Sequence, residues 1–136
     1  MLFRSRYLFS PDKPMSEQSP TILVVEDELL VREAISTVLE EETFTVLLAS
    51  NGDEAVELFI EHYEEIDLVL LDMQMPGKNG DDALEEMQFI DPDIKVIFVT
   101  GVLVEWEALG AIGIIQKPFL VKEVISTVRK ALDLPA

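Results

Sequence analysis

A single carboxylate, Asp72, stands directly after an apolar run in the stretch DLVLLDMQMPGKNG, residues 67–80. A carboxylate can attack phosphorus or bind a cation, although an Asp at a strand end can also do no more than cap a turn. Three other strand-like runs also end on polar residues: Glu26-Asp27, Thr100-Gly101 and Lys117-Pro118. These residues can act together only if the fold brings the ends of the four runs to one edge.

The order of elements along the chain predicts that arrangement. Strands that are covered on both faces read as continuous apolar, β-branched runs, and five such runs occur: 21–26, 44–50, 67–72, 95–101 and 112–118. Helical patterns separate them, for example the inward stripe predicted for Val56, Phe59, Ile60 and Tyr63. Helices are also expected at about 80–90 and 119–132. Strands that alternate with helices form a parallel, doubly wound sheet whose sites lie beyond the carboxyl ends of its strands.

The residue types at that edge suit phosphoryl transfer. Carboxylates that lie close together repel one another unless a cation lies among them, and oxygen-only ligands favour Mg²⁺ over zinc or copper. A lysine and a hydroxyl add donors for an incoming anion. A carboxylate nucleophile with these partners can accept a phosphoryl group while its oxygens are neutralised. The single histidine, His62, falls in the second helix, and we interpret it as a surface or helix-flank residue.

Composition excludes several other classes of function. The 136 residues are 49% hydrophobic, which is enough for one domain with a core. There is no cysteine, so disulfides, thiol catalysis and thiolate metal sites are excluded. The net charge of −17 disfavours binding to nucleic acid or to anionic membranes. No apolar run is long enough to span a membrane and no signal peptide is recognisable, so we expect a cytoplasmic protein.

The first twenty residues differ from the rest. Residues 1–20 are predicted to be a mobile extension, with prolines at 11, 14 and 20, and Met15 is an alternative start. The domain is expected to occupy residues 21–134. Only DLPA follows the last helical pattern, so no output domain is expected.

From about residue 21 to 134 the chain resembles the receiver domain of two-component response regulators. The resemblance lies in five motifs: ILVVEDE, NGDEAVELF, DLVLLDMQMPGKNG, VIFVTG and GAIGIIQKPF. Each is a weak signal alone, but five in order at nearly the family's spacing are specific. The resemblance implies a CheY-like, flavodoxin-like α/β fold with a five-stranded parallel sheet of order 2-1-3-4-5.

The resemblance also implies roles for individual residues. Asp72 would be the phosphoacceptor. A Mg²⁺ ion would be held by Asp27 and Asp72 directly, by Glu26 through water, and by the backbone carbonyl of Gln74.

Two further residues would handle the phosphoryl group. Thr100 would bond one of its oxygens and shift inward, and Lys117 would pair with the phosphate, with the bond to Pro118 typically cis. The donor would be a sensor histidine kinase or a histidine phosphotransfer protein, and the output an unknown downstream protein. The chain would be a monomer or weak homodimer that catalyses only its own phosphorylation and dephosphorylation, and so not an enzyme.

Two departures from the family pattern concern the output. The segment from Thr100 to Gly110 is shorter than usual by about one and a half helical turns, which predicts a shortened fourth helix with Trp106 packed beneath it. Ile114 stands where receivers often have a Tyr or Phe that swings inward. We therefore expect phosphorylation to persist while the signal leaves by another face or through altered pairing.

Two alternative functions remain open. A phosphatase of the haloacid dehalogenase type needs a second Asp two residues after the nucleophile, where this chain has Gln74. A phosphate-independent interaction domain on the receiver fold is the other. Such domains usually lack the acceptor, the acidic pair or the lysine, all of which this chain retains.

Overall fold

The computed structural model describes residues 19–135. The extension predicted for residues 1–20 therefore lies, apart from its last two residues, outside the described part. Along that part the elements run in the order β1 (Thr21–Val25), α2 (Leu29–Glu41), β2 (Thr45–Ala49), α3 (Gly52–His62), β3 (Ile66–Leu71), α4 (Gly80–Ile90), β4 (Val96–Thr100), β5 (Gly113–Gln116) and α5 (Val121–Ala131). Among the described residues no helix is long and apolar enough to cross a membrane.

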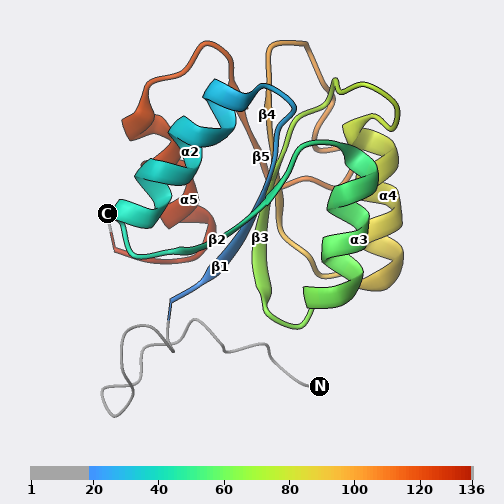
Figure 1. Ribbon diagram of the computed structural model, residues 1–136, viewed down its shortest axis with the longest axis horizontal. Helices are drawn as coiled ribbons and strands as arrows, with labels where there is room; N and C mark the ends of the chain where they lie inside the picture. Colours follow the sequence, from blue (N-terminus) through green and yellow to red (C-terminus); the bar gives the residue numbers. More distant parts are fainter. Residues whose placement is uncertain (1–18, 136) are drawn as a thin grey trace.

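The five strands form one parallel sheet in the order β2-β1-β3-β4-β5, which confirms the predicted topology. Helices α2 and α5 cover one face, and α3 and α4 cover the other (Figure 1). The order of strands reverses between β1 and β3, where the chain moves to the other side of the sheet. That reversal is where doubly wound sheets open a crevice at the carboxyl ends of their strands.

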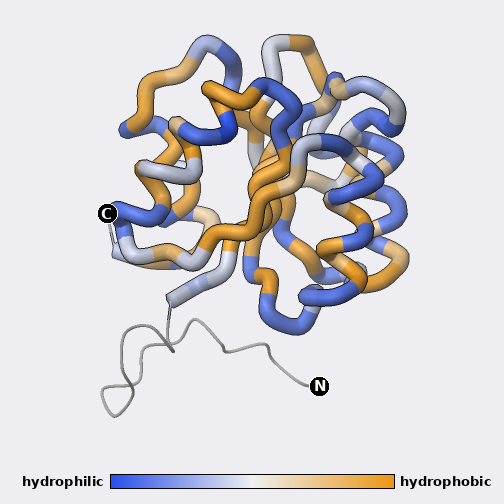
Figure 2. The backbone as a smooth tube through the Cα atoms, in the orientation of Figure 1, coloured by the Kyte–Doolittle hydropathy of each residue, from blue (hydrophilic) through white to orange (hydrophobic). Residues whose placement is uncertain are grey.

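Strand β3 explains why the apolar runs are continuous. Every residue from Ile66 to Leu71 is buried, and successive side chains enter different cores. Leu68 and Leu70 pack with α2 and α5, whereas Val69 and Leu71 pack with α3 and α4. Figure 2 shows the resulting apolar band through the centre of the molecule. Each fully buried side chain of this kind contributes about 1.5–3 kcal/mol, so the central strands hold the rim rigidly in place.

The connection between β4 and β5 contains less helix than predicted. Residues 106–110 form a turn, closed by the Ala111 amide donating to the Trp106 carbonyl at 2.9 Å, and the structure assigns no helix to residues 101–112. A helix advances only about 1.5 Å per residue against about 3.3 Å for extended chain. Twelve residues that must return along the length of β4 therefore leave little room for helix. Trp106 is partly buried against the core on the α3–α4 side, as predicted.

Candidate phosphoacceptor and metal site

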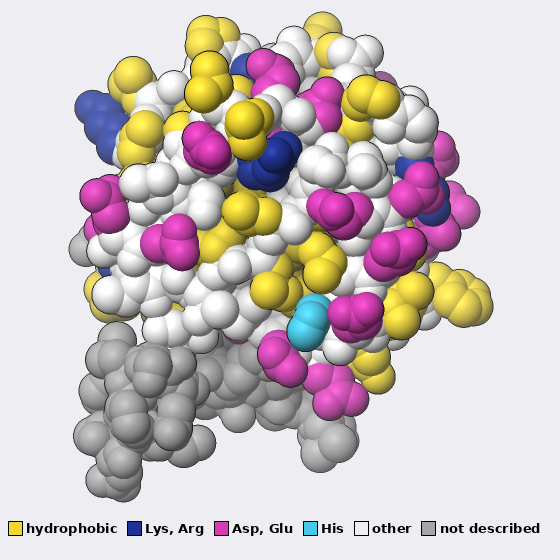
Figure 3. Space-filling model, viewed as in Figure 1, with side chains coloured by type: hydrophobic (Ala, Val, Ile, Leu, Met, Phe, Trp, Pro, Cys, Tyr) yellow, Lys and Arg dark blue, Asp and Glu magenta, His cyan; other side chains and the backbone are white. Residues whose placement is uncertain are grey.

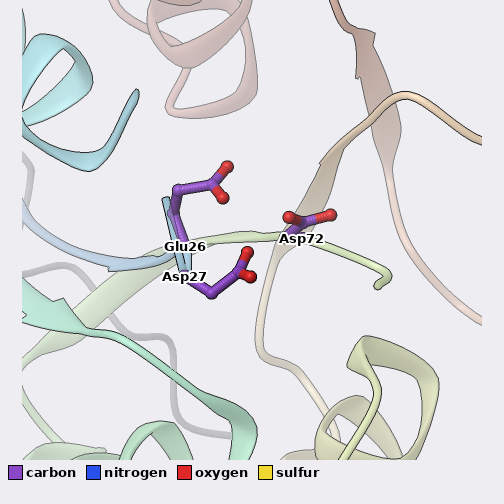
Figure 4. A group of neighbouring side chains, drawn as sticks. All are labelled: Glu26, Asp27 and Asp72. Carbon is purple, nitrogen blue, oxygen red and sulfur yellow. The ribbon is translucent and has the colours of Figure 1, made fainter. Parts of the chain in front are cut away.

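The predicted polar residues do meet at the carboxyl edge of the sheet. Glu26 and Asp27 follow β1, and Asp72 follows the adjacent strand β3. One oxygen from each of these three carboxylates lies within 4.8 Å of the other two. Figure 4 shows the three side chains gathered at the ends of their strands. Strand pairing causes this, since the Asp72 amide donates to the Val25 carbonyl at 3.0 Å and so extends the β1–β3 ladder.

Asp72 is held by contacts to both of its oxygens. The residue is buried, with only 4% of its surface exposed. The backbone amide of Gln74 donates to Oδ1 at 3.2 Å, and Nζ of Lys117 donates to Oδ2 at 3.2 Å. The carboxylate is therefore oriented, and it lies close to the carboxylate of Asp27, which is exposed.

Lys117 is shared among three carboxylates. Its Nζ lies 2.6 Å from Oε1 of Glu26, 3.2 Å from Oδ2 of Asp72 and 3.5 Å from Oε1 of Glu28. Although burial alone would lower the pKa of the Lys117 ammonium, its hydrogen bond to Glu26 and the charges of Glu26 and Asp72 raise that pKa above its usual value. The lysine therefore carries a full positive charge at neutral pH. The peptide bond from Lys117 to Pro118 is cis.

Glu26 is the most deeply buried acid of the group. Its residue is 1% exposed, and burial raises the pKa of its carboxyl to about 7, against the lowering effect of hydrogen bonds from Lys117 and the Glu28 amide. The neighbouring charge of Asp72 raises that pKa further. One lysine thus offsets only part of the negative charge that the fold collects here.

Thr100 occupies the last position of β4, with 1% of its surface exposed. Its carbonyl accepts from the Lys117 amide at 2.9 Å, and its Oγ1 accepts from the Val102 amide at 3.4 Å. The strand pairing that joins β4 to β5 therefore fixes the threonine and the lysine relative to each other.

Two residues of the rim were not identified from the sequence. Arg32, one turn into α2, donates from Nη1 to the Glu26 carbonyl at 2.7 Å and so holds the backbone that carries the acidic pair Glu26-Asp27. Glu28 is the third carboxylate on Lys117, and its amide donates to Glu26 Oε2 at 3.1 Å. A basic residue placed one turn into the helix after an acidic pair is the signal that could have indicated Arg32.

The residues present fit a hard divalent cation. Every side-chain donor in the acidic group is a carboxylate oxygen, and one of them, Asp27, is exposed and can hold a hydrated ion. His62 is not part of this group. It lies at the end of α3 and contacts Glu61 and Glu65, as expected for a surface residue.

Charge repulsion at the site predicts an effect on stability. Asp27→Asn removes one of three carboxylates that lie within 4.8 Å, so it should raise the free energy of unfolding of the metal-free protein by about 0.5–1 kcal/mol. Urea denaturation in EDTA measures this. Mg²⁺ should stabilise the unsubstituted protein by about 1.4 kcal/mol for each tenfold excess over Kd, and the variant much less. A variant that is less stable than the parent in EDTA would contradict the repulsion.

Comparison with known proteins agrees with these observations. Residues 22–129 match the model of the response regulator receiver domain. The chain is 36% identical over 118 residues to sporulation initiation phosphotransferase F of Bacillus subtilis, covering 83% of this chain and 94% of that protein. It is 37% identical over 120 residues to sensor kinase CckA of Brucella abortus, covering 85% of this chain but only 13% of the kinase.

Solved structures give the same result. A chain of the CheX–CheY–BeF₃–Mg²⁺ complex of Borrelia burgdorferi superposes with a TM-score of 0.79 at 27% identity, over 83% of this chain and 89% of that one. A receiver domain protein of Clostridium thermocellum superposes with a TM-score of 0.79 at 31% identity, over 84% and 94% of the two chains. The chain therefore belongs to the response regulator receiver domain family, the signalling modules of two-component systems.

Proposed function

We propose that this receiver domain takes a phosphoryl group from a histidine kinase or a histidine phosphotransfer protein onto Asp72, in a reaction that needs Mg²⁺. The observation that carries the proposal is the setting of Asp72. Its carboxylate contacts Lys117 at 3.2 Å and lies within 4.8 Å of the Glu26 and Asp27 carboxylates. The relatives named above, a phosphotransferase and a sensor kinase, and the BeF₃ and Mg²⁺ of the Borrelia CheY complex support this chemistry.

The chemistry divides among the residues of the rim. A carboxylate oxygen of Asp72 attacks phosphorus in line, the bond from phosphorus to the histidine nitrogen breaks, and its electron pair stays on that nitrogen. Glu26, Asp27, Asp72 and the Gln74 carbonyl would hold the cation, which supplies positive charge to the phosphoryl oxygens when it is bound.

Two other groups respond to the new charge. Lys117 donates to the Asp72 carboxylate in the unphosphorylated protein, and after phosphorylation its ammonium would pair with a phosphoryl oxygen instead. The Thr100 hydroxyl, which accepts from the Val102 amide, would turn to donate to a phosphoryl oxygen. Such charge-assisted bonds contribute on the order of 1.5–3 kcal/mol each, enough to bias two conformations of the rim.

A small phosphodonor tests the proposal without knowledge of the kinase. Incubation with acetyl phosphate and Mg²⁺ should add one phosphoryl group, detected as an intact-mass increase that hydroxylamine removes. The same incubation in EDTA should add none. Absence of the adduct in Mg²⁺ would favour the alternative, a phosphate-independent interaction domain on the receiver fold.

The output surface is expected to differ from that of a receiver with a full helix between β4 and β5. Ile114 is half-buried and packs against the core on the α3–α4 side, and residues 101–112 have no helix to shift. Lys117 instead connects the site to Glu28, which precedes α2. We propose that the signal leaves through the start of α2 and the segment after Lys117.

Amide NMR tests this route. Beryllofluoride with Mg²⁺ should shift amides in residues 26–32, 72–80, 100–102 and 117–121, because Lys117 must exchange Glu28 for the phosphoryl mimic. Residues 103–109 should move least. Large shifts confined to residues 103–112 would contradict the proposed route.

A further inference from the structure

The loop between β3 and α4, residues 72–79, carries the acceptor and the backbone group proposed to bind the cation. The Gly80 amide donates to the Met73 carbonyl at 2.8 Å, a bond that joins the two ends of the loop. The Gln74 amide donates to the side-chain carboxylate of Asp72. Lys78 lies between these contacts and the start of α4, and its side chain adds a further contact.

Lys78 links the loop to both neighbouring helices. Its Nζ lies 3.3 Å from Oδ1 of Asp53, in the first turn of α3, and donates to the carboxylate of Glu86 on α4. Its side chain is 23% exposed, so most of its length is covered. One ammonium therefore ties together three segments that are distant in the sequence.

Backbone packing places Lys78 at this position. A Cβ on Gly52, the first residue of α3, would lie 2.7 Å from the Lys78 carbonyl oxygen. The loop and the start of α3 are thus in direct contact, and only glycine permits that approach. The ion pair between the Lys78 ammonium and Asp53 adds a side-chain contact to this backbone contact between the loop and α3.

The surrounding charge makes this lysine unusually important. The chain has 10 basic residues against 27 acidic ones, and Figure 3 shows acidic side chains spread over the visible face. Without the Lys78 ammonium, the carboxylates of Asp53 and Glu86 would both lose the cation that they share, beside the loop that begins with Asp72. The hydrogen bond that Lys78 donates to the Glu86 carboxylate raises the pKa of Lys78, so the ammonium is charged at neutral pH.

We propose that Lys78 is a positioning residue: by pairing with Asp53 on α3 and Glu86 on α4, it fixes the loop that presents Asp72 and Gln74 to the divalent cation. It touches neither the cation nor the phosphoryl group. The part of this inference that concerns the cation rests on the proposed function, whereas the part that concerns the loop does not.

The experiment compares the parent protein with three single variants and one double variant of the full chain, the double variant combining Lys78→Met with Asp53→Asn. Lys78→Met removes the charge and keeps a chain of similar length, Lys78→Arg keeps the charge, and Lys122→Met removes one charge from an exposed position of α5. Amide hydrogen exchange of the metal-free proteins measures the loop. Chemical shifts of the Gln74 and Gly80 amides during a Mg²⁺ titration measure the site.

Lys78→Met should speed exchange of the amides of residues 73–80 by about three- to tenfold while the amides of β3 keep their rates, since the loop opens locally. The same variant should raise the Mg²⁺ concentration at half-saturation by a similar factor. Lys78→Arg and Lys122→Met should match the parent in both measurements. Asp53→Asn should add little to Lys78→Met, because the pair is already broken.

The possible outcomes distinguish the role of Lys78 in the loop from its link to the cation and from the proposed function. Unchanged loop exchange in Lys78→Met would overturn the role of Lys78, and faster exchange with an unchanged Mg²⁺ titration would overturn its link to the cation. A parent protein that binds no Mg²⁺ while Lys78→Met still loosens the loop would contradict the proposed function and leave the loop contact supported. An equal weakening of Mg²⁺ binding by Lys122→Met would reduce the effect to net charge and overturn positioning.

Discussion

Asp72→Asn is expected to abolish phosphorylation by acetyl phosphate. An amide oxygen is a far weaker nucleophile than a carboxylate, so the rate of adduct formation should fall by about a thousandfold or more, below detection by intact mass. Asn has nearly the same shape as Asp, and the fold should be retained. Mg²⁺ binding should weaken as well, because one of the three carboxylates is lost.

Asp93→Asn is the matched control for that result. Asp93 is exposed and precedes β4, at the opposite edge of the sheet from Asp72. The control removes the same charge and should keep the rate of the parent protein. An adduct of parental yield on Asp72→Asn would show that another residue accepts the phosphoryl group.

Gly80→Ala is expected to damage both the fold and the site. A Cβ at residue 80 would lie 2.2 Å from the Asp72 carbonyl oxygen and 2.9 Å from Cα of Met73, so the backbone that carries the acceptor must move. Overpacking against backbone costs about 1–3 kcal/mol or more. We expect a loss of about 3 kcal/mol in the free energy of unfolding, measured by urea denaturation in EDTA, and slower adduct formation.

Gly101→Ala gives the comparison on the same rim. A Cβ at residue 101 would have one neighbour within 4 Å, the Cβ of Lys117 at 3.8 Å, which is an ordinary van der Waals contact. The backbone φ angle of Gly101 is not in the left-handed region that favours glycine. This variant should unfold within about 0.5 kcal/mol of the parent protein. Equal stability of the two variants would contradict the close approach of α4 to the acceptor loop.

The sheet and its polar rim were predictable because they depend on local pattern and on a topology with few solutions. A continuous apolar run such as that of β3 fits only a strand covered on both faces, and the rule for parallel sheets then places Asp72 beside Glu26. Periodicity was less accurate at the margins of helices. Ile60 was assigned to the buried stripe of α3 but is 56% exposed, whereas Phe59 is buried and Tyr63 packs against the core, so Ile60 lies on the solvent side of the stripe.

Features that depend on tertiary packing were not predictable in the same way. The shortened β4–β5 connection was visible as a missing length, but whether twelve residues form a short helix or a turn depends on the distance that they must span. The contact of Lys78 with Asp53 joins residues 25 positions apart and requires α3 to lie against α4. Glu28 likewise contacts Lys117 only because β1 and β5 both end at this rim.

Chemical trapping of the phosphorylated residue tests the central claim most directly. Borohydride reduces an aspartyl phosphate to homoserine, and fragment mass spectrometry then locates the change in the sequence. After treatment with acetyl phosphate and Mg²⁺, the reduced residue should be found at position 72 alone. Reduction at Glu26, Asp27 or any other acid, with an unmodified Asp72, would contradict the assignment of Asp72 as the phosphoacceptor.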